Sequence, residues 1–561
     1  MPSIIATPND THEVSNQPPP HAPYDAAADL ALIEGLRREG AGWAIDDVRR
    51  LGRTAGGVEA QAWAEQVNRH PPELRTHDRY GNRIDEVEFH PSWHNLMRVA
   101  IAEGCAASAW AESRPGAHVA RIASALVWGH TEAGHGCPVS MTYAAIPALR
   151  QQPELARQYE PLLTSRVYDP GLRPPMDKRG LLAGMGMTEK QGGSDVRANS
   201  TTATPTAEPG VYTLRGHKWF TSAPMCDVFL VLAQAPDGLS CFLLPRVLPD
   251  GTRNPFRIQR LKDKLGNRSN ASAEPEFDGT LAWRVGPEGR GVKTIIEMVN
   301  CTRLDCVSGS TSLLRKAFVE AGHHVRHRSA FGTRLIDAPL MRNVLADLAI
   351  ESEAATTLTL RLAGAADRAI RGPGAGVPHD TADDERAFRR VATAVGKYWV
   401  TKRAPAFTAE ALECLGGNGY VEESGMPRLY REAPLNSIWE GCGNVNALDV
   451  LRALAREPGT ADALLAELDA ARGADRRLDS AVSRLRDELS TVDDMPARAR
   501  GIVERIALAL QGSLLVRYAP AAVADAFCAS RLGGEWGHAF GTLPASAKLT
   551  AIIERALGED A

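Results

Sequence analysis

The hydrophobic pattern of the chain changes twice along its length. In the first third, apolar residues such as Leu30, Ile33 and Leu36 recur every three or four positions, which is typical of amphipathic helices. Between about 181 and 288 the apolar residues form short runs separated by Gly, Pro and Asp-Gly turns, as in β-strands. From Gly291 helical spacing returns and continues to about residue 455, and a further helical stretch follows.

This order of elements predicts an α+β multidomain protein. We expect an N-terminal extended arm and helical domain at 1–180, a β-domain at 181–288, a helical bundle at 289–450 and an extra C-terminal helical domain at 451–561. The arm itself, residues 1–25, is polar and proline-rich. Within the bundle, a Gly/Pro-rich break at 372–378 separates two long predicted helices.

Two polar stretches in the first domain have no obvious helical pattern. Residues 76–91 are dense in polar groups, and we interpret them as an ordered surface loop, with pocket lining as the alternative. Residues 130–137, His-Thr-Glu-Ala-Gly-His-Gly-Cys, contain metal-binding residue types. Their spacing matches no regular zinc pattern, so a loop is the better interpretation and no metal site is expected.

Composition and charge exclude several classes of protein. The net charge is −4 with a pI near 6.5, which gives no indication of a polyanionic partner. The nine cysteines form no Cys-x-x-Cys pair, which favours free thiols in a reducing compartment. The chain has neither a signal-peptide pattern at its start nor an apolar run near the ~20 residues that span a bilayer. We therefore expect a soluble cytoplasmic protein without a membrane partner.

One carboxylate stands out in the stretch 431–452. Glu440 follows Ser-Ile-Trp and precedes Gly-Cys-Gly-Asn, which leads into a run with helical spacing. A neighbouring indole and partial burial raise the pKa of a carboxyl, which suits a general base near neutral pH. A solvated loop glutamate beside a buried tryptophan would give the same pattern, so this stretch alone leaves both possibilities open.

Three further motifs resolve that choice by resemblance. Gly-Met-Gly-Met-Thr-Glu-Lys-Gln-Gly-Gly-Ser-Asp-Val at 184–196 lies about 25 residues before Lys-Trp-Phe-Thr-Ser at 218–222, and Arg-Ser-Ala-Phe-Gly occurs at 328–332. Together with Glu440 these motifs resemble the acyl-CoA dehydrogenase flavoprotein family, through at least residues 180–450. The resemblance is strongest to the AidB-like branch, the bacterial alkylation-response flavoproteins with an additional C-terminal helical domain.

The resemblance implies an FAD cofactor and assigns residues to it. Thr188 and Ser194 would bond the flavin ring and the phosphates, while Trp219 would pack on the ring and Thr221 would bond near its N5. Simple core packing remains the alternative for Trp219. The full set of expected FAD contacts is Met185, Thr188, Gly193, Ser194, Trp219, Phe220, Thr221, Ser222, Arg328, Phe331, Gly416, Gly417, Ile438, Gly441 and Asn444. No Gly-x-Gly-x-x-Gly dinucleotide motif is present, so a nicotinamide cofactor is not expected.

In the family a neighbouring subunit completes the adenine half of FAD through Arg-x-x-Phe-Gly and Gly-Gly-Asn-Gly motifs. Here these motifs fall on Arg328, Phe331 and 416–419. The resemblance therefore implies a homotetramer built as a dimer of dimers.

The family also implies the reaction, in which a glutamate removes the α-proton of an acyl-CoA thioester while the β-hydride passes to flavin N5. Trp439-Glu440-Gly441 matches the motif of that base. The alternative base position before an arginine reads Asn300-Cys-Thr-Arg303 and carries no carboxylate, which leaves Glu440 as the candidate. Arg303 is the expected substrate contact. Asn300 departs from the more common Asp, so the substrate is not identified.

The AidB-like branch is associated with double-stranded DNA, and its DNA-contacting arginine matches Arg452; Arg531 is a second candidate. The last domain has no net positive charge, and a solvated helix face with mixed charges is the alternative to a DNA-binding face.

Three functions remain open. They are an acyl-CoA dehydrogenase of alkylation stress that binds DNA weakly, an ordinary short- or branched-chain acyl-CoA dehydrogenase, and a DNA-shielding scaffold with a structural flavin.

Overall fold

The computed structural model describes residues 11–372, 379–491 and 493–558. Residues 11–29 contain no regular element, and seven helices follow before the main sheet. They are α1 (Leu30–Arg38), α2 (Ile45–Ala55), α3 (Val58–Arg69), α4 (Pro91–Ala102), α5 (Ala117–Trp128), α6 (Gly136–Leu149) and α7 (Pro153–Leu163). The large side chains of Trp93 and Trp128 are fully buried between them, as the helical spacing of apolar residues requires.

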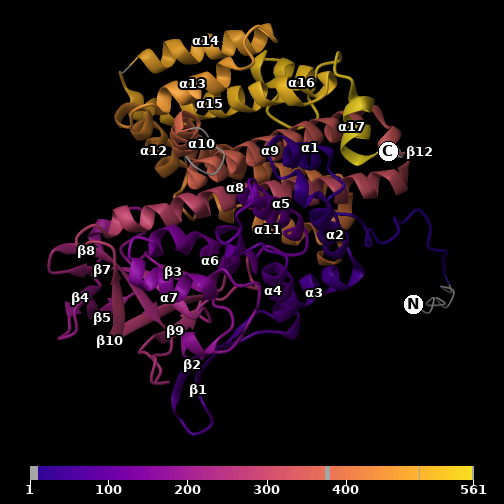
Figure 1. Ribbon diagram of the computed structural model, residues 1–561. Coiled ribbons are helices and arrows are strands. Elements are labelled where there is room, and N and C mark those ends of the chain that lie inside the picture. Colours follow the sequence, from indigo (N-terminus) through magenta and orange to yellow (C-terminus); the bar gives the residue numbers. More distant parts are fainter. Residues whose placement is uncertain (1–10, 373–378, 492, 559–561) are drawn as a thin grey trace.

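The polar stretch in the first domain forms a β-hairpin, so the expectation of a surface loop at 76–91 is wrong. Strands β1 (Glu73–His77) and β2 (Arg83–Glu88) pair antiparallel, with a shift of register between Arg75 and His77. Figure 1 shows this hairpin extending away from the body of the molecule. Because neither strand has a fully buried face, charged residues occupy most positions and conceal the period of two.

The main sheet has eight strands. They are β3 (Ala183–Gly186), β4 (Thr202–Pro205), β5 (Val211–His217), β6 (Thr221–Ser222), β7 (Val228–Ala235), β8 (Gly238–Pro245), β9 (Arg257–Leu261) and β10 (Ser272–Val285). The order is β3-β7-β4-β5-β10-β6, with β8 pairing with β7 and β10 and β9 pairing with β10. Pairing is antiparallel except for β3 and β4 against β7. All but one residue of β7 are buried, which explains why its sequence is a continuous apolar run.

Long helices follow the sheet and form the centre of the molecule. They are α8 (Gly291–His327), α9 (Pro339–Arg371), α10 (His379–Glu413), α11 (Met426–Glu432) and α12 (Gly443–Arg456). A short hairpin of β11 (Ser329–Ala330) and β12 (Thr333–Arg334) lies between α8 and α9. The predicted break at 372–378 falls almost wholly on residues outside the described part of the chain. These elements confirm the predicted arrangement of a helical domain, a β-domain and a helical bundle.

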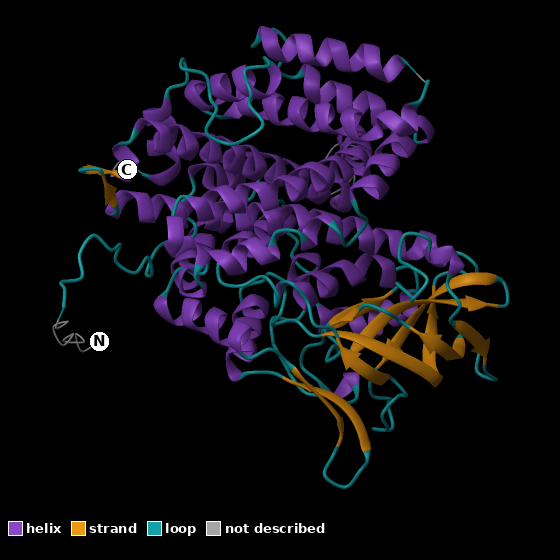
Figure 2. Cartoon of the chain, turned by 180° about the vertical axis from the view of Figure 1, so that it is seen from behind, coloured by secondary structure: helices purple, strands orange, loops and turns teal. Residues whose placement is uncertain are grey.

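The last five helices cover the bundle on the side away from the sheet (Figures 1 and 2). They are α13 (Thr460–Asp469), α14 (Arg476–Ser490), α15 (Met495–Tyr518), α16 (Ala521–Phe527) and α17 (Leu549–Leu557). Helix α17 returns to α1 and α9, where Arg555 binds Glu34 at 2.7 Å and Glu353 at 2.8 Å. Within the described residues no helix is both long and apolar enough to span a membrane.

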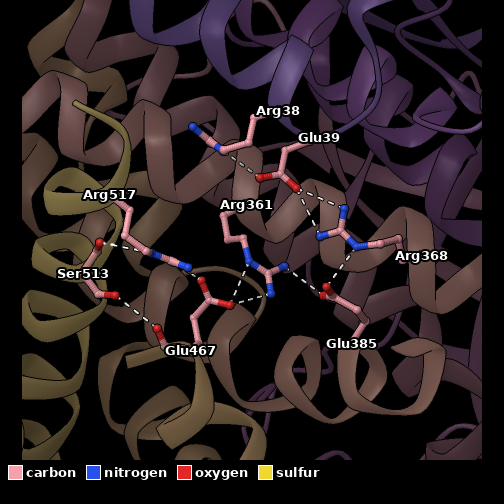
Figure 3. Close-up of polar contacts among 8 residues, drawn as sticks. All are labelled: Arg38, Glu39, Arg361, Arg368, Glu385, Glu467, Ser513 and Arg517. Carbon is pink, nitrogen blue, oxygen red and sulfur yellow. Dashed lines mark hydrogen bonds and ion pairs between the residues drawn. The ribbon is translucent and has the colours of Figure 1, made fainter. Parts of the chain in front are cut away.

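A chain of ion pairs joins the first, central and last helical parts (Figure 3). Arg361 on α9 binds Glu385 on α10 at 2.8 Å and Glu467 on α13 at 2.7 Å. Arg368 continues the chain from Glu385 to Glu39 at the end of α1, with distances of 2.9 and 3.1 Å. Each carboxylate here accepts bonds from more than one group, which is the condition for mostly buried charges to be tolerated.

Candidate active site

Glu440 lies in a strained turn that projects it toward α8. The turn follows a short 3-10 helix (Leu435–Ser437) and ends where α12 begins at Gly443. Glu440 has φ +58° and Gly441 has φ +94°, so two successive residues are left-handed. A glutamate rarely adopts this conformation, and such strain is concentrated at functional sites. A Cβ at residue 441 would lie 2.9 Å from Val445, so glycine is required there for space as well as for conformation.

Three groups on α8 and α10 fix the turn. The hydroxyl of Thr302 donates to Glu440 Oε2 at 2.7 Å, and Arg303 Nε donates to the backbone oxygen of Glu440 at 3.1 Å. Lys397 Nζ donates to the backbone oxygen of Gly441 at 2.8 Å. One carboxylate oxygen is therefore held while the backbone of the turn is anchored by two cations.

Burial raises the pKa of the Glu440 carboxyl above its ordinary value. The Thr302 hydrogen bond and the charges of Lys397 and Arg303 act in the opposite direction, and the net shift remains upward. A carboxylate with a raised pKa is a stronger base than an exposed glutamate.

The indole of Trp439 is oriented by a hydrogen bond that the sequence did not predict. Its Nε1 donates to Asn436 Oδ1 at 2.9 Å, and Asn436 Nδ2 donates to Ser310 Oγ on α8 at 3.1 Å. The residue before the base is thus tied to the same helix that holds the base.

The two glycine- and hydroxyl-rich segments form a second cluster at the edge of the sheet. Trp219 N donates to the backbone oxygen of Thr188 at 2.8 Å, so the two segments lie side by side. Beneath them Lys218 Nζ binds Glu189 Oε1 at 2.7 Å, and both side chains are fully buried. Glu189 also accepts from the backbone of Thr201 at 3.1 Å. This buried ion pair, which sequence reasoning missed, fixes the distance between the two predicted flavin segments.

Unpartnered and exposed groups of this cluster fit the ring and phosphates of a flavin. Thr221 Oγ1 is buried and has no hydrogen-bond partner, so it is free to bond a ring nitrogen. Gly193 and Ser194 are exposed beside Thr188, and a Cβ at residue 193 would lie 2.6 Å from the Thr188 hydroxyl. Half of Phe220 is exposed, although it is a large apolar residue. An unpartnered hydroxyl, an uncovered aromatic side chain and an open glycine turn are the features that a bound flavin would cover.

Cations surround the aromatic side chains of the cluster. Lys262 Nζ lies 3.6 Å from the centroid of the Trp219 ring and 4.3 Å from that of Phe220. Such contacts hold the rings in place through cation–π attraction. Met185 on β3 and Ser222 on β6 complete the set and are half-buried.

Cys137, at the start of α6, lies near both Glu440 and the second flavin segment. The Cys137 thiol, whose pKa burial raises to about 11, interacts with the Ser222 hydroxyl and also lies within electrostatic range of Glu440. The base and the cluster are therefore brought together by folding although more than 200 residues separate them in sequence.

Other predicted cofactor residues lie elsewhere. Arg328 follows the end of α8, 25 residues after Arg303, which corresponds to about 38 Å along the helix. Phe331, at the tip of the β11–β12 hairpin, is fully exposed, and Gly416 and Gly417 are exposed as well. Their predicted FAD contacts stay predictions.

Ile438 and Asn444 flank the Glu440 turn and are exposed. The structure therefore places them beside the base rather than beside the sheet. Their predicted FAD contacts stay predictions.

Arg303 is buried and paired with Asp449 at 2.7 Å, and a direct contact of this residue with substrate stays a prediction. Asp449 also binds Arg390 at 3.0 Å and contacts Arg452 at 3.6 Å. The Arg452 side chain is 61% exposed, as a DNA contact requires. Arg531 is fully buried against Asp347 and Glu351, so the expectation that it contacts DNA is wrong.

A cavity of about 720 Å³ lies beside the same part of α8. Asn300 and Cys301, which precede Thr302, form part of its wall. Its charged lining comprises Arg150, Arg386, Arg389 and Arg390 together with Glu297, Asp383 and Glu457. No group of three potential metal ligands occurs in the described part of the chain.

Comparison with known proteins gives a consistent result. Residues 16–170 match the model of the adaptive response protein AidB N-terminal domain, 184–280 match the acyl-CoA dehydrogenase middle domain, and 289–455 match the acyl-CoA dehydrogenase C-terminal domain. The chain is 46% identical to "Putative acyl-CoA dehydrogenase AidB" of Escherichia coli over 524 residues. The aligned region covers 92% of this chain and 94% of that protein.

Solved structures resemble the fold over most of its length. ACDH-11 of Caenorhabditis elegans, solved in complex with C11-CoA, superposes with a TM-score of 0.82 at 28% identity and covers 93% of each chain. The apo-form of Bd2924 gives 0.81 at 30% identity, covering 91% of this chain and all of the other. The strained base, the two cofactor segments and these matches together show that the chain belongs to the AidB-like branch of the acyl-CoA dehydrogenase family of FAD-dependent oxidoreductases.

Proposed function

We propose that this protein removes the α-proton of an acyl-CoA thioester with the Glu440 carboxylate. The observation that supports this role most directly is the left-handed Glu440 turn, which is held by Thr302, Arg303 and Lys397. Cys137 lies near both Glu440 and Ser222 of the second flavin segment. A carboxylate in a half-buried site with a raised pKa is suited to take a proton from a weakly acidic carbon.

FAD, when bound, would accept the hydride that leaves the β-carbon of the substrate. Thr221 and Thr188 would supply hydroxyls to it, and Trp219 would cover one face of the ring. The buried Lys218–Glu189 pair supports these positions from below. Arg328 follows the end of α8, 25 residues after Arg303, and its partner Asn16 is next to Gln17, which binds Asn418. We therefore assign Arg328 and residues 416–419 to the FAD of a neighbouring subunit, in a tetramer built as a dimer of dimers.

The cavity next to Asn300 and Cys301 is the candidate location of the coenzyme A moiety. Its volume of about 720 Å³ falls in the range of small-molecule sites, and its arginines suit phosphate groups. The crystallised complex of ACDH-11 with C11-CoA, a structure of the same fold, supports an acyl-CoA substrate.

Glu440→Gln tests the proposal. The amide keeps the shape of the side chain but cannot accept the proton, so flavin reduction by an acyl-CoA should slow by about 100-fold or more while bound FAD is unchanged. Anaerobic stopped-flow bleaching with a panel of short, medium and long acyl-CoAs is the measurement, and Glu423→Gln, at an exposed position on the same segment, is the matched control. Bleaching of Glu440→Gln at the wild-type rate would overturn the role of this residue.

We also propose weak, non-specific binding of double-stranded DNA as part of an alkylation response in the cytoplasm. Support comes from the match to the AidB N-terminal domain and from the exposed guanidinium of Arg452; Arg476 and Arg484 on α14 are exposed too. Nine free cysteines suit a reducing compartment. Binding through a few phosphate contacts should fade between about 50 and 200 mM salt.

A gel-shift assay at low salt compares wild type, Arg452→Ala and Arg75→Ala, the last being an equal change of charge on the distant β1–β2 hairpin. Retardation that weakens only in Arg452→Ala supports the DNA role. If wild type gives no retardation, or if both variants behave like wild type, the function is that of a dehydrogenase without this DNA contact.

A further inference from the structure

The N-terminal arm, residues 11–24, lies along the C-terminal end of α8. It has no regular secondary structure, and Figures 1 and 2 show it at the same end of the molecule as the β11–β12 hairpin. Most of its residues are exposed, so burial of apolar surface does not explain its path. Specific hydrogen bonds fix the path of the arm instead.

Asn16 forms a paired contact with the first residue of the hairpin. Its Nδ2 donates to the backbone oxygen of Ser329 at 2.9 Å, and its Oδ1 accepts from the backbone nitrogen of Ser329 at 2.8 Å. The side chain thus satisfies both backbone groups of one residue, as a neighbouring strand would. Asn16 has φ +55°, a conformation that asparagine tolerates better than most residues.

The arm also contacts the two segments that we assigned to the neighbouring subunit's cofactor. The backbone oxygen of Asn16 accepts a bond from Arg328 Nη1 at 2.5 Å. The next residue, Gln17, accepts through Oε1 from Asn418 Nδ2 at 3.2 Å. Residues 16 and 17 therefore connect the end of α8 with the glycine-rich 416–419 segment.

Further along the arm, aromatic and charged contacts fix it to one face of α8. His323 Nε2 lies 2.8 Å from the backbone oxygen of Pro19, and His21 pairs with Glu320 at 3.1 Å. The ring of His21 stacks between Tyr24 and His323, with centroid distances of 4.3 and 4.5 Å. Glu320 and His323 are three residues apart and so lie on the same side of the helix.

We propose that Asn16 and Gln17 form a clip that positions Arg328 and Asn418 for the FAD bound by a neighbouring subunit. This inference rests on the proposed assignment of those segments to the shared cofactor. The two residues are positioning residues: they hold the segments in place without contacting the reacting atoms. Without the clip, a half-buried arginine and an exposed glycine-rich turn would each have to be ordered when the cofactor binds, which weakens binding.

The test compares wild type with Asn16→Gly, Gln17→Ala and the double variant in the full-length protein. Glycine is compatible with φ +55°, so Asn16→Gly removes the side chain and its two hydrogen bonds without straining the arm backbone. The measurement is the rate of FAD release, followed by flavin fluorescence after dilution, together with oligomer size by light scattering. We expect about tenfold faster release in the double variant, from the loss of three hydrogen bonds. Glu13→Ala, an exposed substitution in the same arm, should release FAD at the wild-type rate.

A double-mutant cycle separates positioning from a general effect on stability. In an Asn418→Ala background, Gln17→Ala should have no further effect on FAD release, because its partner is already missing. Independent, additive effects would overturn the clip. If wild type itself retains no flavin, the proposed function fails; if wild type retains flavin and the double variant releases it no faster, only the clip fails.

Discussion

The hydrogen bond from Thr302 to Glu440 gives a quantitative prediction for the pH dependence of the reaction. The hydroxyl donates to Glu440 Oε2 at 2.7 Å and lowers the pKa of a carboxyl that burial raises. Thr302→Val keeps the shape of the side chain but removes the donor. A hydrogen bond to a charged group contributes about 1.5–3 kcal/mol, and 1.36 kcal/mol corresponds to one pKa unit, so the upper limit of the shift is about two units.

The structure favours the lower end of that range. The same hydroxyl can donate to the backbone oxygen of Val299 at 3.1 Å, so this carbonyl competes with the Glu440 carboxylate for the single hydroxyl proton. We therefore expect the pKa of Glu440 in Thr302→Val to rise by about one unit. Because the base acts in its ionised form, the rate at pH values below the wild-type midpoint should fall about tenfold, and the plateau at high pH should be retained.

The assay is anaerobic flavin bleaching as a function of pH, with the acyl-CoA that reduces the wild type fastest. Thr302→Ser retains the hydroxyl and should keep the wild-type midpoint. An unchanged or lower midpoint in Thr302→Val would show that this hydrogen bond does not set the basicity of Glu440.

Three further predictions concern ion pairs and the shared cofactor. Lys218→Met should lower the free energy of unfolding, measured in urea, by about 3–5 kcal/mol, because it leaves Glu189 buried without its cation. Glu189→Gln in the same chain should restore part of the loss. Equal stability of Lys218→Met and wild type would contradict this. Arg531→Met should destabilise the protein for the same reason, since Asp347 and Glu351 remain buried, and a folded sample should bind DNA as wild type does. Arg328→Glu should reduce both FAD content and oligomer size on gel filtration, and an intact tetramer with full flavin would argue against its assignment to a neighbouring subunit.

The order of helical and β regions and the candidate base could be predicted from the sequence because both signals are local. Helical and strand periods are visible within short windows, and Trp439-Glu440-Gly441 is a contiguous motif. Thr302 was not predicted as the partner of Glu440, since 138 residues separate them and the sequence around Arg303 drew attention only to the missing carboxylate.

The two incorrect predictions, for Arg531 and for the β1–β2 hairpin, have different physical causes. Arg531 precedes two glycines, which suggests an exposed loop, yet its partner Asp347 lies 184 residues earlier on α9. The β1–β2 hairpin was missed because solvent reaches both faces of its strands, so charge obscures their alternation. For Arg531 the deciding interaction is tertiary and has no signature within a short window of sequence, whereas the hairpin is local and its signature is obscured by charge.

The ion pairs between α9 and the last helices bear on how far this chain could be shortened. Helix α9 buries Asp347, Glu351 and Glu353, and the arginines that bind them include Arg531 and Arg555 from the C-terminal domain. Deleting that domain would remove the guanidinium partners of these carboxylates, and any carboxylate left buried without a partner would destabilise the bundle; Glu351 alone would keep a pairing, with Arg403 at 3.2 Å. The helix and the domain that covers it are therefore matched in charge, and we expect truncation before α13 to leave a less stable bundle rather than an intact shorter protein.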